Sequence, residues 1–239
     1  MDTNHAPVLP DCAACPFDWP ARACRKPGGQ GPKNCPTLTG NTLAQEALLA
    51  TVRDNAEFAR QASVQEASGY GDRDRGYDRV RPLKPRIQEL MEFAGRMKYQ
   101  RLGLAFCIGL RLEAAVVREI LTVNGFEMLS ACCKVGRVPK SAIAIDREDQ
   151  VDPASENETM CNPVFQAILC NEGRTELNVL LGLCVGHDSL FIKYSQAPVT
   201  VLAVKDRLLG HNPLAAIYQH ASYWRCLKQP LDRTPGDES

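Results

Sequence analysis

Cysteines are the residues with the most chemical potential in this sequence, which contains 11 of them. Two segments resemble each other: LGLAFCIGL at 102–110 and VLLGLCVGH at 179–187 each run into a cysteine, a branched aliphatic residue and a glycine. The two cysteines are Cys107 and Cys184. Thiolates are nucleophiles and ligands for soft metal ions, so both segments indicate metal or thiol chemistry.

A second group of cysteines lies in residues 1–40, which are rich in proline and glycine and show no helical or strand period. Its members are Cys12, Cys15, Cys24 and Cys35. The Cys-x2-Cys pair at its start is a common way to offer two ligands to one ion. Four thiolates suit either a zinc ion or an iron–sulfur cluster. Pro16 and Pro36, each directly after a cysteine, favour iron–sulfur.

The elements that must position the first group alternate between strand and helix. Strands are predicted at 101–107, 126–133, 141–145, 177–184 and 199–206, with helices at 110–125, 162–174 and 187–195. Strands that are apolar throughout indicate a parallel sheet covered on both faces. The fold class expected is therefore α/β: a three-layer, doubly wound, mostly parallel sheet of Rossmann or flavodoxin type.

Four regions follow from these patterns. Residues 1–40 form a cysteine-rich metal-binding module, and 41–98 form a helical hairpin with a polar linker. Residues 99–229 form the α/β domain, and 230–239 form a disordered tail. The two helices of the hairpin are expected at 42–67 and 85–99, on either side of the linker.

Ligands bind beyond the carboxyl ends of the strands in such a sheet. Cys107, Cys184 and the pair Cys132–Cys133 all fall at that edge, and Cys161 precedes a helix start that could reach it. Because adjacent strand residues face opposite ways, one of Cys132 and Cys133 is expected to face the site. Two other cysteines, Cys170 and Cys226, are expected to act as small core residues.

Polar residues follow the same strand ends. His187, Asp188, Lys205, Asp206 and His211 are candidate catalytic residues, acting as proton donors or substrate clamps. Asp188 is equally well explained as the N-terminal cap of its helix. Lys134, next to Cys133, is expected to offset thiolate charge.

Composition excludes several classes of function. Lys and Arg total 28, and so do Asp and Glu, and the basic stretch at 69–86 is interleaved with aspartates, so no nucleic-acid partner is expected. No apolar run approaches the ~18–20 residues needed to cross a bilayer, and no signal peptide is evident. A cytoplasmic location is expected, where abundant cysteine indicates metal or thiol chemistry instead of disulfides.

Several strings together resemble a known family: PKNCP, AFCIGL, SACCKVG, MCNP, GLCVGHDSLFIKYSQAPVT and VKDRLLGHNPLAAIY. The chain looks like a family of uncharacterised cysteine-rich proteins, catalogued as a domain of unknown function and as predicted metal-binding proteins, mainly of anaerobic bacteria and archaea. The resemblance covers most of the chain. It implies metal binding and brings no established reaction. The positions it marks are Cys12, Cys15, Cys24, Cys35, Cys107, Cys132, Cys133, Cys161, Cys184, His187, Asp188, Lys205, Asp206 and His211.

Three functions remain open from the sequence. The first is an iron–sulfur protein with one or two 4Fe-4S clusters, held by the N-terminal four cysteines and by Cys107, Cys133, Cys184 and Cys161. It would catalyse reductive or sulfur-handling chemistry with an electron donor protein or a small-molecule substrate. The second is a metal or cluster carrier, or a redox sensor. The third is thiol–disulfide chemistry, with zinc at the N-terminal site. The oligomeric state stays open.

Overall fold

The computed structural model describes residues 9–230. Residues 9–67 belong to one compact unit and residues 68–230 to another, and each is considered by itself. The tail predicted to be disordered, 230–239, lies outside the described residues except for Pro230. The finer division into four regions stays a prediction.

The first unit combines an irregular segment with a long helix. Residues 9–40 contain the four-residue helix α1 (Pro36–Thr39), and not one of them is buried. Helix α2 (Asn41–Ser68) matches the helix predicted at 42–67 and is kinked at Asn55, where φ is −137°. The buried side chains of α2 are Gln61 and Gln65, so this unit has little apolar core of its own.

The second unit begins with a small hairpin inside the predicted linker. Strands β1 (Tyr70–Gly71) and β2 (Arg81–Pro82) pair antiparallel. An ion pair of 2.8 Å between Arg81 Nε and the Asp72 carboxylate closes the loop between them. The aspartates and arginines of this stretch therefore neutralise one another locally, as expected for a solvated segment.

Four parallel strands form the sheet that positions the candidate site. They are β3 (Arg101–Phe106), β4 (Glu127–Cys132), β5 (Leu177–Leu181) and β6 (Val199–Ala203), in the spatial order β4-β3-β5-β6. The α/β class and the parallel sheet are thus confirmed. A fifth strand expected at 141–145 is wrong, because Lys140–Ile143 is a tight 3-10 turn and Ala144 has a φ of 56°. Its side chains at 141–144 are exposed, so no buried face supports a strand there.

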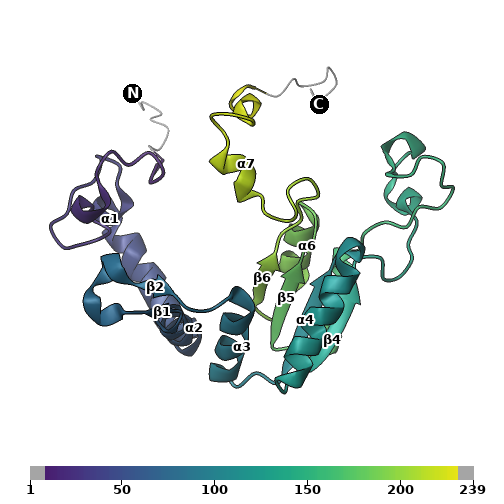
Figure 1. The fold of residues 1–239 in the computed structure, drawn as a ribbon, viewed down its shortest axis with the longest axis horizontal. Helices are drawn as coiled ribbons and strands as arrows, with labels where there is room; N and C mark the ends of the chain where they lie inside the picture. The colour runs from purple at the N-terminus through teal and green to yellow at the C-terminus, as the bar shows by residue number, and fades with distance from the viewer. Residues whose placement is uncertain (1–8, 231–239) are drawn as a thin grey trace, which may run out of the picture. The chain divides into compact units, whose positions relative to one another are not determined.

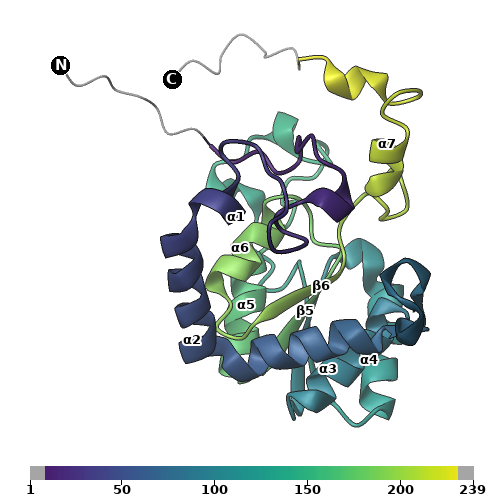
Figure 2. The ribbon, with the colours of Figure 1, turned by 90° about the vertical axis from the view of Figure 1, so that its left-hand side faces the viewer.

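Helices cover both faces of the sheet (Figure 1). Helices α3 (Arg86–Arg96) and α4 (Arg111–Val123) pack on one face, where their apolar side chains join those of β3 and β5 in one core cluster. Helices α5 (Pro163–Glu172) and α6 (His187–Tyr194) lie together on the other face (Figure 2). The short helix α7 (Leu214–Tyr218) follows the last strand. The closer likeness to Rossmann or flavodoxin folds stays a prediction.

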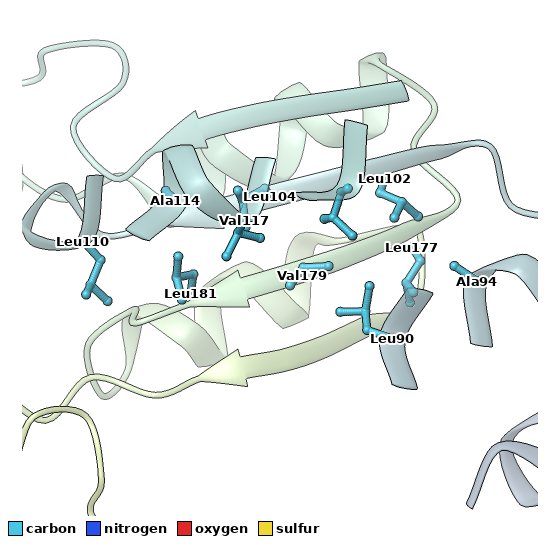
Figure 3. Close-up of a cluster of buried hydrophobic side chains, with 11 residues drawn as sticks. Leu90, Ala94, Leu102, Leu104, Leu110, Ala114, Val117, Leu177, Val179 and Leu181 are labelled. Carbon is cyan, nitrogen blue, oxygen red and sulfur yellow. The ribbon is translucent and has the colours of Figure 1, made fainter. Parts of the chain in front are cut away.

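Alternation along the strands explains why both faces are apolar. Leu102 and Leu104 point to the face of α3 and α4, whereas Ala105 packs with the cluster beneath α5 and α6. Figure 3 shows the first two side chains among those of β5, facing segments of α3 and α4. Burying a leucine contributes roughly 1.5–3 kcal/mol, so the paired strands are strongly held in this register.

The order in which successive strands are added to the sheet changes side at β3. It passes from β3 through α4 to β4 on one side, and then through α5 to β5 on the other side of β3. Neighbouring strands whose connections leave in opposite directions open a crevice at their carboxyl ends. The carboxyl ends of β3 and β5 are therefore the expected place for a functional site.

Gly182, directly after β5, is a position at this edge where the fold does not tolerate a side chain. Its φ is +66°, and an added Cβ would lie 2.0 Å from Leu110 Cδ1. Gly182→Ala is expected to lower the free energy of unfolding by about 2–4 kcal/mol, through left-handed strain and overpacking. Urea denaturation measures it.

Gly95→Ala, in α3, is the matched control. Gly95 is exposed, has no positive φ and nothing near a new Cβ, so alanine should stabilise the chain by about 0.5–1 kcal/mol. Equal effects of the two substitutions would contradict this account of the sheet edge.

Candidate functional site

Three cysteines gather at the carboxyl end of the sheet. Cys107 directly follows β3, Cys133 directly follows β4, and Cys161 comes two residues before α5. Cys107 is 7 % exposed and Cys133 is 2 % exposed, while Cys161 is half-buried and packs against the same apolar cluster. These three residues are called the thiol cluster below.

Cys133 lies at the centre of the thiol cluster. Its Sγ accepts a hydrogen bond of 3.3 Å from the backbone N–H of Ile108, one residue after Cys107. A hydrogen bond with Cys161 and burial both raise the pKa of Cys133, which therefore keeps its proton. The protonated thiol of Cys133 donates to the sulfur of Cys161.

Cys161 carries the negative charge of this pair. The hydrogen bond from Cys133 lowers the pKa of Cys161 to about 5, although burial acts in the opposite direction. Lys134 and His187 assist, because a positive charge on either side chain favours the thiolate. Two sulfurs thus share one proton, and the charged one is the more exposed of the two.

Backbone hydrogen bonds hold the cluster in place. The N–H of Cys133 donates to Phe106 O at 2.8 Å, and the N–H of Asn162 donates to Cys133 O at 2.8 Å. Asn162 also caps α5, since its side-chain oxygen accepts from the Phe165 N–H at 3.0 Å. The start of α5 is therefore joined to the ends of β3 and β4, which brings Cys161 to Cys133.

Gln166 is a supporting residue that sequence reasoning missed. Its side chain is completely buried, and its Nε2 donates to Phe106 O at 3.2 Å and to Ala131 O at 2.7 Å. These carbonyls belong to the residues just before Cys107 and Cys132. The Oε1 atom of the same amide is buried and has no partner within residues 9–230. A glutamine one turn into a helix that starts beside a cysteine was the only signal available.

The other two predicted ligands at this edge have different neighbours. Cys132 is half-buried, and its Sγ accepts from the Lys134 N–H at 3.5 Å. Cys184 Sγ accepts from Nη2 of Arg207 at 3.0 Å. Of the adjacent pair, it is Cys133 that faces the thiol cluster.

Two of the candidate catalytic residues lie near the thiol cluster, and three make local hydrogen bonds. His187 helps to lower the pKa of Cys161, and the ammonium of Lys205 lies near Gly109 and Cys107. Asp206 instead accepts from the N–H groups of Leu208 and Leu209, and His211 Nδ1 accepts from the Asp206 N–H at 3.1 Å.

Asp188 also makes a local contact, because its carboxylate accepts from the N–H of Ser189 at 2.8 Å, in the first turn of α6. The hydrogen bonds of these side chains are therefore local: those of Asp188, Asp206 and His211 stabilise turns. None of these bonds joins them to the thiol cluster.

The N-terminal cysteines share one small pocket of about 50 Å³ in the first unit. Cys12, Cys15, Cys24 and Cys35 all line it, together with Arg22. Arg22 is fixed there by bonds from Nη2 to Cys15 O (3.3 Å) and from Nε to Phe17 O (2.7 Å).

Gly31 allows the close approach of Cys35, because an added Cβ on Gly31 would lie 2.7 Å from the sulfur of Cys35. A chain with no buried residue in this segment still gathers four thiols.

Metal binding stays a prediction at both places. Within residues 9–230, no group of three or more His, Cys, Asp or Glu side chains is arranged to hold a metal ion.

Cys170 is fully buried, and burial raises its pKa to about 11, in agreement with a core role. Cys226 is exposed, so the core role expected for it is wrong. No helix in the described part of the chain is long and apolar enough to cross a membrane.

Comparison with known proteins places these residues in context. A protein of Methanocaldococcus jannaschii, itself uncharacterised, is 47 % identical over 135 residues, which cover 56 % of this chain and 67 % of that protein. No solved structure matches the chain. A family model, described as a protein of unknown function (DUF1847), matches residues 35–202. That segment includes the thiol cluster but not Cys12, Cys15 and Cys24, nor Lys205 and the residues after it. Because the match spans well over half of the sequence, the chain belongs to the DUF1847 family.

Proposed function

We propose that this chain is a cysteine-ligated metal protein whose N-terminal site is formed by Cys12, Cys15, Cys24 and Cys35. The observation that carries the proposal is the shared pocket that these four residues line. Residues 9–40 bury no side chain, so the hydrophobic effect supplies little to hold them in one shape. A metal ion that crosslinks four points of such a segment contributes the missing folding free energy.

The donor set fits a thiolate-bound metal. The four cysteines are free thiols, and Cys12 and Cys24 are exposed, so their side chains can rotate toward a common centre at little cost. Four thiolates exceed the charge of a divalent ion by two, and Arg22 in the wall of the pocket offsets part of that excess. The proline after Cys15 and the one after Cys35 favour an iron–sulfur cluster, with zinc as the alternative.

The thiol cluster is proposed as the second site and the working centre. Cys107, Cys133 and Cys161 would hold a cluster there, with Cys184 as a further candidate. A cluster with three cysteine ligands supplies an iron that is open to a substrate. Lys134 and His187 would then stabilise negative charge on the thiolates or on the substrate. Reductive or sulfur-handling chemistry suits these features, and the alternative without turnover is a cluster carrier or redox sensor.

Metal content tests the proposal directly. The full chain purified without oxygen is expected to be brown, with about four to eight irons per chain measured by mass spectrometry and visible absorption. Cys15→Ser should remove the iron bound at the N-terminal site. Cys161→Ser should reduce the iron bound at the thiol cluster, because each substitution deletes a proposed ligand. Cys226→Ser is the control, since this exposed cysteine belongs to neither set.

Gly31→Ala refines the same test without deleting a thiol. An added methyl group displaces the sulfur of Cys35, so the N-terminal metal should be lost while all cysteines remain. A colourless chain that contains one zinc ion would mean that the N-terminal site holds zinc instead of an iron–sulfur cluster. A chain with no bound metal under these conditions would refute the proposal.

Thiol chemistry at the thiol cluster, without a metal, is the second candidate function. The hydrogen bond between Cys133 and Cys161 favours it. Cys161 as thiolate attacks a peroxide oxygen, which releases water or an alcohol and leaves a sulfenic acid. The thiol of Cys133 then displaces the hydroxyl group as water and forms the disulfide. Two thiols lose two electrons in all, and the peroxide gains them.

Alkylation measures the lowered pKa of Cys161. At pH 6.5 an ordinary thiol is about one per cent thiolate, whereas Cys161 is mostly thiolate because the pH lies above its pKa. Iodoacetamide should therefore label Cys161 well before Cys133 in metal-free, reduced protein, as followed by peptide mass spectrometry. Lys134→Met should slow the labelling of Cys161. Equal rates for the two cysteines would contradict the assignment of the charge.

Oxidation tests the second candidate itself. One equivalent of hydrogen peroxide should link Cys133 to Cys161 in metal-free protein, detected as a loss of two hydrogens in one crosslinked peptide pair. Cys133→Ser should instead leave a sulfenic acid that reacts with dimedone. Cys170→Ser, which removes a buried thiol of raised pKa, is the matched control and should not change the crosslink.

A further inference from the structure

Residues 138–160, called the arm below, form a long excursion of the chain between Cys133 and Cys161. The arm follows β4 and ends just before α5 (Figure 1). Not one of its residues is buried, so apolar packing contributes little to holding it in place. An excursion of this length in a compact domain usually has a function.

The arm is closed by a short neck, which consists of Val138, Lys140, Glu158 and Met160. The Met160 N–H donates to Val138 O at 2.8 Å, and the Lys140 N–H donates to Glu158 O at 2.9 Å. The side chains of Lys140 and Glu158 form an ion pair of 2.9 Å, and each is only 16 % exposed. The Glu158 carboxylate also accepts from the Asp152 N–H at 3.1 Å, which joins the neck to the far part of the arm.

The thiol pair lies at the base of this neck. The Asn162 N–H donates to Cys133 O at 2.8 Å, so the two legs of the arm are also joined beside the cysteines. The Cys133 thiol is hydrogen-bonded to Cys161, as described above. The ammonium of Lys134 donates to the carbonyl oxygen of Thr159 in the returning leg. The contacts that close the arm therefore continue without interruption into the Cys133–Cys161 pair.

A hydrogen bond and a disulfide at this base restrain the arm to different extents. In the reduced chain, few bonds close the neck and no core supports it, so local opening is expected to be easy. A covalent bond between the two legs lowers the conformational entropy of the opened arm. Opening is then less favourable, although every contact of the closed arm stays the same.

We propose that the arm is a redox-sensitive element, in which a disulfide between Cys133 and Cys161 holds the neck closed. This proposal rests on the second candidate function, which supplies the disulfide. Each thiol loses its hydrogen as the S–S bond forms, and the two electrons and two protons convert hydrogen peroxide into two molecules of water. Oxidation of two sulfurs within the fold thus changes how readily an exposed arm opens.

Amide hydrogen exchange, followed by NMR in the full, 15N-labelled, metal-free chain, tests the proposal. The N–H groups of Met160 and Lys140, the two donors of the neck, are compared before and after one equivalent of hydrogen peroxide. Their exchange is expected to slow about tenfold or more, because the disulfide closes a long loop. The Tyr99 N–H, which donates to Ala94 O at 2.9 Å ahead of β3, should exchange at the same rate in both states.

Three variants make the result specific. Glu158→Gln breaks the ion pair of the neck and should speed the exchange of both neck amides in the reduced chain. Glu156→Gln is the matched control, because this carboxylate of the arm is 82 % exposed and lies 3.9 Å from Arg147, so the neck amides should not respond. Cys133→Ser cannot form the disulfide, and its neck amides should not respond to peroxide.

Peptide mass spectrometry of the same samples separates this proposal from the function on which it rests. A Cys133–Cys161 disulfide with unchanged exchange at Met160 and Lys140 would overturn the role of the arm and leave the second candidate function in place. A chain that forms no such disulfide would overturn both. Slower exchange of the neck amides in Cys133→Ser after peroxide would also contradict the proposal, since no covalent bond at the base could cause it.

Discussion

The geometry of the thiol cluster depends on how the start of α5 is joined to the ends of two strands. The Cys133 N–H bonds to Phe106 O, the Asn162 N–H bonds to Cys133 O, and the buried amide of Gln166 bonds to Phe106 O and Ala131 O. Each bond contributes only about 0.5–1.5 kcal/mol, but together they fix three chain segments at one point. Cys107, Cys133 and Cys161 lie on those segments, so their spacing follows from these bonds.

Burial then divides the chemistry among the three sulfurs. The most buried thiols, Cys107 and Cys133, lie within apolar packing, whereas Cys161 is half-buried next to Lys134 and His187. Charge is favoured where water and cations remain, so the negative charge of the Cys133–Cys161 pair belongs on Cys161. The Oε1 of Gln166 has no partner within residues 9–230, which costs about 1–3 kcal/mol, so this amide joins the strand ends at some expense in stability.

The two cysteine sets represent opposite physical situations. The thiol cluster is built on a sheet that apolar packing holds in register on both faces. The four N-terminal cysteines surround a pocket in a segment with no buried residue. A metal at the thiol cluster would bind to a fold that exists without it. A metal at the N-terminal cysteines would instead contribute to the folding of that segment. Loss of such a metal would therefore alter reactivity at the thiol cluster and local structure at the N-terminal pocket.

The sequence by itself determined the α/β class, the four strands of the sheet, the helices between them and the edge at which the cysteines fall, because buried strands and amphipathic helices leave strong apolar patterns. It was wrong for 141–145, where short apolar alternation has no buried face. Only the tertiary structure decided that Cys133 and Cys161 share a proton, that Cys184 contacts Arg207, that Gln166 joins the strand ends and that Lys205 lies over Gly109. These contacts join residues far apart in the chain, and their geometry depends on packing that no local pattern encodes.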